Sequence, residues 1–572
     1  MNSTKAFWIC ILLLFVNTKF SYGQEELIPE VKREKILKPN SEHVFTLNLN
    51  KGELVIFYIT NYSSDLQFLA WNENNEIVEQ TETFDGTDIP IFHARETGKY
   101  NIKITPLHQL KDAIKYNLQL KVIKSNTNDK AEIISKLLKS FYPKNEPGSC
   151  VSIMYEGKVI LQECYGLSNI SYQSKNNEQT LFNLASVSKQ FTAYGISLLS
   201  SKGLISLNDD IRKFIPELPE YSKPIKIENL LNHTGGFYEN DFPLALAGYD
   251  NSFIPKEKEF QFIYSNKDVL FNSGEQFQYS NTGYVLLAEI ISRVTKMKFN
   301  QWMSENVFIP IGMSSTLVLD DMNTVVINKA ESYVKSKDGE YIISPVNFDA
   351  PGPGNILTNI DDLTKWITHI DSISKESTLY NKKTFLNNGE EVNYIFGNFY
   401  SSFKGNKMIS HLGLTSGYRT SLARFPEKNI SVALLANNGM WKTYDLASEI
   451  FEIMLSDEIQ LEKLKATIFE KESNKKVTSS EKKPLQNTNL EKLTGFYYSD
   501  KIQTYFQVTM ENGNLFLSNF FNPQIRLTNT NINEFSSDVW YLNKIKFNEN
   551  DDKTSMTIFN DRDTAAIKFF KQ

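Results

Sequence analysis

The chain has 572 residues, a length that corresponds to about four domains of ordinary size. Its 61 basic and 67 acidic side chains give a net charge of −6, and this mild acidity provides no electrostatic footprint for nucleic acid or an anionic membrane. Apolar residues at 41% and charged residues at 22% match ordinary globular usage, which excludes disorder throughout, collagen and a multi-span membrane protein. Three cysteines are too few for a disulfide scaffold.

The first 23 residues predict a targeting signal rather than part of the fold. Lys5 precedes the apolar run 6–16, which is too short to cross about 30 Å of hydrocarbon as a helix. The small residues Ser21 and Gly23 follow this run, and we expect cleavage after Gly23. The alternative is a membrane anchor that stays attached. Cleavage predicts an exported chain, periplasmic or extracellular, without an integral membrane span.

Strand-like alternation of apolar and polar residues runs from about residue 40 to 123, for example at Phe45, Leu47 and Leu49. Period-two patterning with frequent turns predicts a β-sandwich, to which we assign residues 24–125. This region resembles the β-sandwich modules that are appended to secreted bacterial hydrolases.

Residues 126–460 mix helical and strand patterns. A helix is expected at 186–201, a buried strand at 431–435 and a helix at about 443–455. The order of elements is a helix, strands, a mostly helical middle and further strands. This order predicts an α+β domain with one antiparallel sheet. Residues 461–487, rich in Lys, Glu and Ser, predict a linker. Short strands around turns such as Asn512-Gly513 predict a small β-barrel over residues 488–572.

Cys150 and Cys164 flank a predicted β-hairpin with its turn at Glu156-Gly157. If Tyr155 pairs with Lys158, the two cysteines are within one residue of being opposite each other. This register allows a cross-strand disulfide in an oxidising compartment, but a slip of one residue would point the side chains to opposite faces of the sheet. The sequence leaves open a disulfide or two half-buried thiols.

The search for catalytic motifs leaves one candidate. The chain has six His and neither an HExxH nor a CxxC motif, so we expect no metal. It also has no P-loop and no GxGxxG, so we expect no cofactor, and the absence of GxSxG counts against an α/β-hydrolase. Several Ser-x-x-Lys sequences occur, but only Ser186–Lys189 follows a strand-like segment and opens an apolar helix.

The position of Ser186–Lys189 favours chemistry. A Ser in the first helical turn lies near unpaired N–H groups and the positive end of the helix dipole. Lys189, three residues on, falls on the same helix face. Among apolar neighbours this Lys would lose its proton more readily and help to activate the Ser. An isolated Ser-x-x-Lys is more often a helix cap with a solvated Lys.

Two further elements make the pattern specific. Tyr279 and Asn281 are two residues apart in an extended turn and so point the same way, and His411-Leu412-Gly413 follows later. In this order, the three elements resemble the serine β-lactamase and penicillin-binding-protein family, in the branch of class C β-lactamases, DD-peptidases and family-VIII esterases. Residues 204–210, 230–236 and 354–363 fit the same family, and the end region resembles a lipocalin-like domain.

The resemblance implies a central antiparallel sheet flanked by helices, an all-helical subdomain and an acyl-enzyme on Ser186. Tyr279, its pKa lowered by Lys189, would act as general base. The backbone N–H groups of Ser186 and Leu414, the residue after Gly413, would form the oxyanion hole. Asn281 would hydrogen-bond the acyl side chain and Lys189. His233 is expected to shape its loop rather than to take part in chemistry.

His411 stands where β-lactamases usually place Lys. Because His is neutral or only partly charged near pH 7, it would be a weaker anchor for a substrate carboxylate. This departure favours an ester, amide or D-amino-acid peptide bond in a small-molecule or peptide substrate. The alternatives are a β-lactamase or DD-peptidase, a non-catalytic penicillin-binding sensor, and carbohydrate or surface binding by the flanking β-domains. The C-terminal domain would cap the cleft or join protomers.

Overall fold

The computed structural model describes most of the chain from Glu25 onward. The predicted signal segment 1–23 and the predicted linker 461–487 lie outside the described residues. The chain divides into two compact units, one up to Leu137 and one from Leu138. The described residues are 25–39, 41–61, 66–83, 90–106, 113–123, 130–239, 241–249, 254–336, 339–376, 380, 383–439, 442–455, 490–500, 502, 504–519, 524–537, 539–550, 553–559 and 566–572.

The first unit is a β-sandwich, as the alternating pattern predicted. One sheet has the strand order β1 (Glu25–Glu26), β3 (His43–Leu49), β8 (Gly98–Pro106), β5 (Leu66–Trp71) and β6 (Ile77–Thr83). The other has the order β2 (Arg33–Leu37), β9 (Ile114–Ile123), β4 (Leu54–Asn61) and β7 (Ile91–His93). Phe45 and Phe68 of the first sheet and Phe57 and Tyr116 of the second are buried in one core, because alternate residues of each strand face inward.

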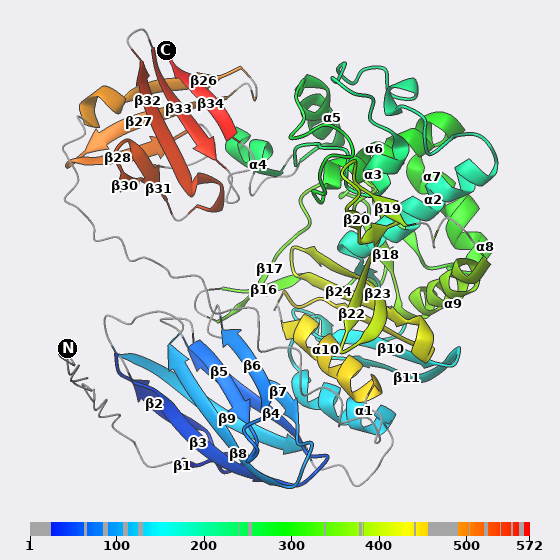
Figure 1. Ribbon diagram of the computed structural model, residues 1–572, viewed down its shortest axis with the longest axis vertical. Coiled ribbons are helices and arrows are strands. Elements are labelled where there is room, and N and C mark those ends of the chain that lie inside the picture. Colours follow the sequence, from blue (N-terminus) through cyan, green and yellow to red (C-terminus); the bar gives the residue numbers. More distant parts are fainter. Residues whose placement is uncertain are drawn as a thin grey trace, which may run out of the picture. The chain divides into compact units, whose positions relative to one another are not determined.

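The second unit contains a seven-stranded antiparallel sheet (Figure 1). Its order is β11 (Lys158–Tyr165), β10 (Ser149–Tyr155), β25 (Ile430–Ala436), β24 (Tyr418–Phe425), β23 (Asn406–Thr415), β22 (Asn398–Phe403) and β21 (Tyr394–Ile395). The strand β10 therefore pairs with β25 from the far end of the domain. Both α9 (Ile360–Glu376) and α10 (Lys442–Leu455) contact β25, whose residues are buried throughout. The predicted α+β class is confirmed.

A helical region holds the residues around the predicted nucleophile (Figure 1). The helix α2 (Lys189–Ser201) contacts α6 (Asn281–Thr295), which also contacts α3 (Ile227–Leu231) and α7 (Phe299–Met303). Phe191 of α2 stacks on Trp366 with ring centroids 4.1 Å apart. The sequence predicted one helix over 186–201, whereas the structure begins with the 3₁₀ turn η1 (Ala185–Ser188) and continues as α2.

The other elements before the C-terminal region include α1 (Lys130–Phe141), which crosses the boundary between the two units. The rest are β12 (Leu167–Asn169), β13 (Ser174–Lys175), β14 (Phe182–Asn183), η2 (Ile211–Lys213), α4 (Asp241–Leu244), η3 (Ala245–Tyr249), α5 (Lys256–Ser265), η4 (Ser304–Phe308), α8 (Ile309–Ile311), β15 (Leu317–Val318), β16 (Tyr333–Lys335), β17 (Tyr341–Ile343), β18 (Ile356–Thr358), β19 (Thr384–Phe385), β20 (Glu391–Val392) and η5 (Pro426–Lys428). None of the helices in the described part of the chain is long and apolar enough to cross a membrane.

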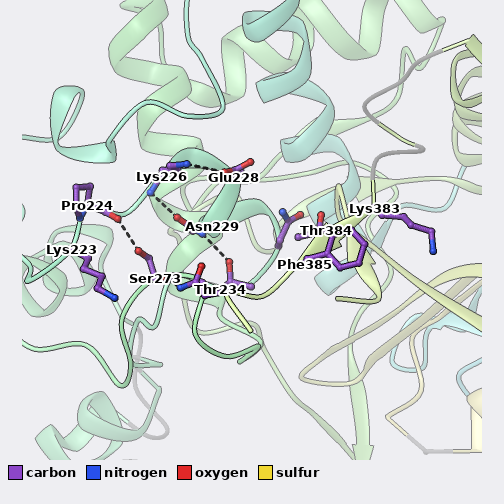
Figure 2. Close-up of a pocket in the computed structure, with 13 residues that line it drawn as sticks. Lys223, Pro224, Lys226, Glu228, Asn229, Thr234, Ser273, Lys383, Thr384 and Phe385 are labelled. Carbon is purple, nitrogen blue, oxygen red and sulfur yellow. Dashed lines mark hydrogen bonds and ion pairs between the residues drawn. The ribbon is translucent and has the colours of Figure 1, made fainter. Parts of the chain in front are cut away.

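A cavity of about 540 Å³ opens beside α3 and the β19–β20 hairpin (Figure 2). Three lysines line it, and each lies within ion-pair distance of a glutamate: Lys223 with Glu275, Lys226 with Glu228 and Lys383 with Glu391. None of the seven predicted site residues lines the cavity. It is therefore separate from the predicted catalytic residues.

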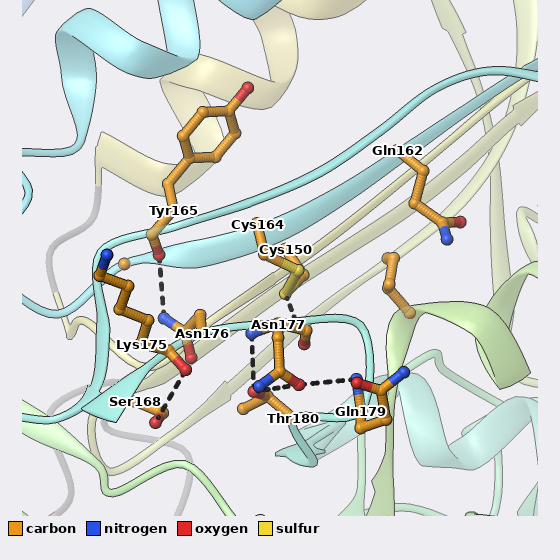
Figure 3. The surroundings of a disulfide bond; sticks show 12 residues. Cys150, Gln162, Cys164, Tyr165, Ser168, Lys175, Asn176, Asn177, Gln179 and Thr180 are labelled. Carbon is orange, nitrogen blue, oxygen red and sulfur yellow. Dashed lines mark hydrogen bonds between the residues drawn. A yellow bond between two sulfur atoms is a disulfide. The ribbon is translucent and has the colours of Figure 1, made fainter.

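A disulfide between Cys150 and Cys164 joins the two strands of the β10–β11 hairpin, and the Cα atoms of the two cysteines are 4.1 Å apart (Figure 3). Tyr155 pairs with Lys158, as assumed from the turn, but the register shifts between Ile153 and Met154. This bulge adds one residue to β11 and brings the two cysteines directly opposite each other. The one-residue discrepancy in the sequence therefore had a local structural cause.

The C-terminal region is all-β. Its strands follow one another as a nearly continuous antiparallel sheet, and the first, β26 (Gly495–Ser499), pairs with the last, β34 (Ala566–Lys571). The tight turn Asn512-Gly513 has positive φ at both residues, as a two-residue hairpin turn requires. The elements are η6 (Leu490–Leu493), β26 (Gly495–Ser499), β27 (Thr504–Glu511), β28 (Asn514–Ser518), β29 (Ile525–Arg526), β30 (Thr528–Asn531), β31 (Glu534–Ser536), η7 (Trp540–Leu542), β32 (Lys544–Asn550), β33 (Lys553–Phe559) and β34 (Ala566–Lys571).

Candidate active site

Ser186 lies in a constrained turn between β14 and α2. The preceding residue, Ala185, has φ of +47°, a left-handed conformation that costs a non-glycine residue about 1–3 kcal/mol. The Asn183 side-chain oxygen accepts the Ala185 N–H at 2.8 Å, and Leu184 N–H donates to the Ile356 carbonyl at 2.9 Å. These contacts hold the turn in its strained conformation and leave the Ser186 side chain half-buried.

The side chain of Lys189 is fully buried beside Ser186. Its Nζ donates to Ser186 Oγ at 3.1 Å, to Asn281 Oδ1 at 2.8 Å and to the Pro353 carbonyl at 3.1 Å. Three acceptors match the three N–H bonds of an ammonium group. The sequence predicted apolar surroundings that would help Lys189 to lose its proton. The structure instead combines these acceptors with the rings of Tyr279 and Tyr284, which lie 4.9 and 5.5 Å from Nζ.

The Tyr279 ring lies under the Lys189 ammonium, with Nζ 4.9 Å from the ring centroid. Burial raises the pKa of Tyr279, a hydrogen bond with Ser186 lowers it, and the Glu239 carboxylate raises it further, so the net shift is upward. The expected lowering of this pKa by Lys189 is therefore outweighed. The reason is that loss of hydration on burial destabilises the phenolate by more than the neighbouring groups stabilise it.

Asn281 begins α6, which Ser280 caps by accepting the Gly283 N–H. While its Oδ1 faces Lys189, the Asn281 backbone N–H and Nδ2 both donate to Glu239, at 2.7 and 3.0 Å. Sequence reasoning missed Glu239. The one available signal was its position three residues after the family-like segment 230–236.

His411 lies in β23, with ring centroid 6.1 Å from that of Tyr279. Its Nδ1 is 2.6 Å from the Leu412 carbonyl oxygen and its Nε2 is 3.1 Å from the Tyr394 hydroxyl. A carbonyl only accepts, so Nδ1 carries the hydrogen and Nε2 accepts from Tyr394. Burial, with the Lys189 charge second, lowers the pKa of His411 to about 3. His411 is therefore uncharged at neutral pH.

This burial predicts an acid-dependent loss of stability. An unfolded His takes up a proton below pH 6.5, whereas folded His411 does so only near pH 3. The free energy of unfolding should therefore fall as the pH drops from 6.5, by about 2 kcal/mol at pH 5 from this residue. Urea unfolding at pH 7 and pH 5 should show a smaller loss for His411→Asn than for the wild type. Equal losses in the two proteins would contradict the prediction.

His233 packs against Tyr279, with ring centroids 4.3 Å apart. Its Nδ1 accepts the Ser280 backbone N–H at 3.0 Å, and burial lowers the pKa of His233 well below its usual value, with Lys189 and His411 adding to the effect. A neutral, buried ring that holds the Tyr279–Asn281 turn is the loop-shaping role expected from the sequence.

Gly413 brings β23 against the nucleophile turn. A Cβ on Gly413 would lie 2.3 Å from the Leu184 carbonyl oxygen and 3.1 Å from the Ala185 Cβ. The Gly413 carbonyl accepts the Tyr444 hydroxyl at 2.6 Å. Leu414 follows with a side chain that is 45% exposed. The missing side chain of Gly413 thus allows the two backbones to meet beside Ser186.

A family model described as Beta-lactamase matches residues 134–448, more than half of the chain. This match covers Ser186, Lys189, Tyr279 and His411. The chain belongs to the beta-lactamase family.

Relatives in this family carry different descriptions. Penicillin-binding protein 4* of Bacillus subtilis is 27% identical over 342 residues, which are 56% of this chain and 74% of the relative. A D-aminopeptidase of Brucella anthropi is 24% identical over 298 residues, 51% of this chain and 56% of that protein. The octameric penicillin-binding protein homologue from Pyrococcus abyssi has a TM-score of 0.50 at 22% identity, covering 78% of this chain and all of that one. This last similarity shows the fold.

Within the described residues of this beta-lactamase family protein, no group of three His, Cys, Asp or Glu side chains is arranged to hold a metal ion. The polar groups around Ser186 are instead a buried lysine, a tyrosine, an asparagine and a glutamate, together with neutral histidines. They can transfer protons and stabilise charge on an oxygen.

We expect Gly413→Ala to inactivate the protein. The added Cβ, 2.3 Å from the Leu184 oxygen, must push β23 away from Ser186 and displace the Leu414 N–H. The family resemblance implies that this N–H is an oxyanion donor, and loss of one such donor lowers kcat by about 10²–10³-fold. The crowding costs about 1–3 kcal/mol of stability. Ester turnover and urea unfolding measure the two effects. Gly98→Ala is the control, because its Cβ would meet its nearest atom at 3.5 Å. A Gly413→Ala protein with wild-type turnover would contradict this expectation.

Proposed function

We propose that the protein is a serine hydrolase that forms an acyl-enzyme on Ser186 and hydrolyses an ester, amide or D-amino-acid peptide bond. The observation that carries the proposal is the contact of Ser186 Oγ with Lys189 Nζ at 3.1 Å, together with the Tyr279 ring, whose centroid is 4.9 Å from the same Nζ. A serine hydroxyl that contacts a buried lysine beside a tyrosine is the arrangement of an activated nucleophile.

The reaction starts from the form in which Tyr279 has lost its proton and the Lys189 ammonium stabilises the phenolate. The phenolate takes the Ser186 proton while Oγ attacks the substrate carbonyl carbon. The N–H groups of Ser186 and Leu414 stabilise the resulting oxyanion. The tetrahedral intermediate then breaks its bond to the leaving oxygen or nitrogen, which receives the proton from Tyr279. Water repeats the sequence on the acyl-enzyme and releases Ser186.

The preference for esters, amides and D-amino-acid peptides rests on His411. A neutral imidazole that already accepts from Tyr394 supplies no charge to a substrate carboxylate, so β-lactams lose an anchor at this position. The D-aminopeptidase of Brucella anthropi supports the same choice. A second candidate is a β-lactamase or a DD-peptidase, or a sensor that is acylated without turnover; the similarity to penicillin-binding protein 4* favours it.

We also propose export to the periplasm or the extracellular space. The apolar start of the chain and the Cys150–Cys164 disulfide support it, because such bonds persist in oxidising compartments. Assembly into an oligomer is a further proposal, supported by the octameric homologue from Pyrococcus abyssi, and we propose the C-terminal domain as the contact.

The test is intact-mass spectrometry after treatment with a fluorophosphonate or a penicillin, alongside turnover of a nitrophenyl ester and a D-alanine nitroanilide. We expect one fluorophosphonate adduct and turnover in the wild type, and neither in Ser186→Ala. Ser401→Ala is the matched control, because Ser401–Lys404 is also a Ser-x-x-Lys sequence but Ser401 is exposed. Rapid penicillin labelling without turnover of any substrate would favour the sensor. Equal labelling of wild type and Ser186→Ala would overturn the proposal.

A further inference from the structure

Glu239 forms the outer end of a hydrogen-bonded chain that leads to Ser186. Its two carboxylate oxygens accept from the Asn281 backbone N–H and from Asn281 Nδ2. The other end of the same amide, Oδ1, accepts from Lys189 Nζ at 2.8 Å, and Nζ in turn donates to Ser186. The chain therefore runs from Glu239 through Asn281 and Lys189 to Ser186.

The backbone next to Glu239 is held in place independently. The Tyr238 carbonyl accepts the Thr282 hydroxyl at 2.9 Å, so the segment is also tied to the first turn of α6 next to the Asn281 contact. A carboxylate at this position also lies at the positive end of a 15-residue helix, which favours a negative charge. Glu239 is thus held beside the start of α6 by contacts that do not involve Lys189.

The orientation of the Asn281 amide matters because its two ends have opposite hydrogen-bonding character. The oxygen accepts and the NH₂ group donates, so a reversed amide would set two donors against each other at Lys189. A carboxylate has acceptors only, and it can therefore pair with Nδ2 but not with Oδ1. The partner of Nδ2 decides which end of the amide faces Lys189.

We propose that Glu239 is a positioning residue for the Ser186 reaction: by accepting from both Asn281 donors, it holds the Asn281 oxygen on Lys189. This inference rests on the proposed function. Its role is to keep the Lys189 ammonium at a fixed place between Ser186 and the ring of Tyr279. Nothing in this role requires Glu239 to touch the substrate.

Glu239→Gln provides the sharpest test, because Gln keeps the size of the side chain and replaces one acceptor with a donor. One of the two Asn281 donors must then face an NH₂ group, and the amide loses its preferred orientation. We expect the rate of Ser186 labelling by a fluorophosphonate, and kcat for a nitrophenyl ester, to fall by about 10–100-fold, the effect of misplacing a reacting group. KM should change by less than about threefold, since binding is not the step affected.

Glu289→Gln is the matched control. Glu289 lies on the same helix α6 and is partly buried. Its carboxylate pairs with Arg293 and Lys256 rather than with Asn281 or Lys189. We expect wild-type rates for this variant. A loss equal to that of Glu239→Gln would mean that any lost glutamate charge on this side of the domain has the effect, and would overturn the inference.

A double-mutant cycle separates positioning from a general structural role. If Glu239 acts through Asn281, then Glu239→Gln should cost less than about threefold in an Asn281→Ala background, because coupled residues are not additive. If the rate losses of Glu239→Gln and Asn281→Ala are additive in the double variant, the inference would be overturned, even if Glu239→Gln alone has the expected effect. If the probe labels the wild type and the Glu239→Gln variant reacts at the wild-type rate, this inference alone would be overturned. A wild type that the probe does not label would overturn the proposed function and this inference together.

Discussion

Lys189→Met is expected to lower kcat/KM by about 10³-fold or more. Met has a similar length but no N–H donor, so Ser186 Oγ loses a partner and the Tyr279 phenolate loses the charge 4.9 Å from its ring. Loss of acid–base assistance accounts for about 10²–10⁴-fold, and the loss of the polar contact to Ser186 adds to it. Steady-state turnover of a nitrophenyl ester gives the ratio.

The same variant should also be less stable. The Asn281 side-chain oxygen and the Pro353 carbonyl would lose a buried donor, at a cost of about 1–3 kcal/mol for each acceptor left unpaired. Urea unfolding measures this loss. Lys202→Met, at the exposed end of α2, is the control and should behave as the wild type. A Lys189→Met protein within tenfold of wild-type kcat/KM would contradict the assigned role.

Tyr279→Phe is expected to lower kcat/KM by about 10²–10⁴-fold and to change its pH dependence. Because burial raises the pKa of Tyr279, the phenol is the dominant form at neutral pH. The phenolate fraction therefore grows about tenfold for each pH unit, and wild-type kcat/KM should rise from pH 6 through the alkaline range. The Phe variant has no phenol to ionise and should lack this rise.

The measurement is kcat/KM for a nitrophenyl ester at pH 6 to 9, corrected for spontaneous hydrolysis. Tyr172→Phe is the control, since Tyr172 is 83% exposed, and it should reproduce the wild-type profile. A wild-type profile that is flat over this range, or a Phe variant that keeps the rise, would exclude Tyr279 as the base.

Local patterns predicted much of the fold. Alternation at Phe45, Leu47 and Leu49 predicted a sandwich strand, which the structure has as β3, and the turn at Asn512-Gly513 joins β27 to β28. The apolar run at 431–435 is part of β25. These predictions succeed because they depend on side-chain periodicity and turn chemistry within a few residues.

The surroundings and pKa values of the site residues were harder to predict from the sequence. Residue type and order in the sequence identified Ser186, Lys189, Tyr279 and His411, but they showed neither the hydrogen-bond acceptors around Lys189 nor the net rise of the Tyr279 pKa. Both depend on what lies around each group: the Pro353 carbonyl is 164 positions from Lys189, and Tyr279 is largely desolvated. Glu239, 42 positions from Asn281, carries no motif of its own.

The sequence by itself determined the family resemblance, the secondary structure around Ser186 and the β-rich flanking regions, because spacing along the chain is sufficient for helices, strands and turns. Only the tertiary structure decided the cysteine register, the neutral state of His411 and the contact between Glu239 and Asn281. A β-bulge, burial and a long-range hydrogen bond produce these features. The stability of each feature depends on residues that are distant in the sequence and become neighbours only in the folded protein.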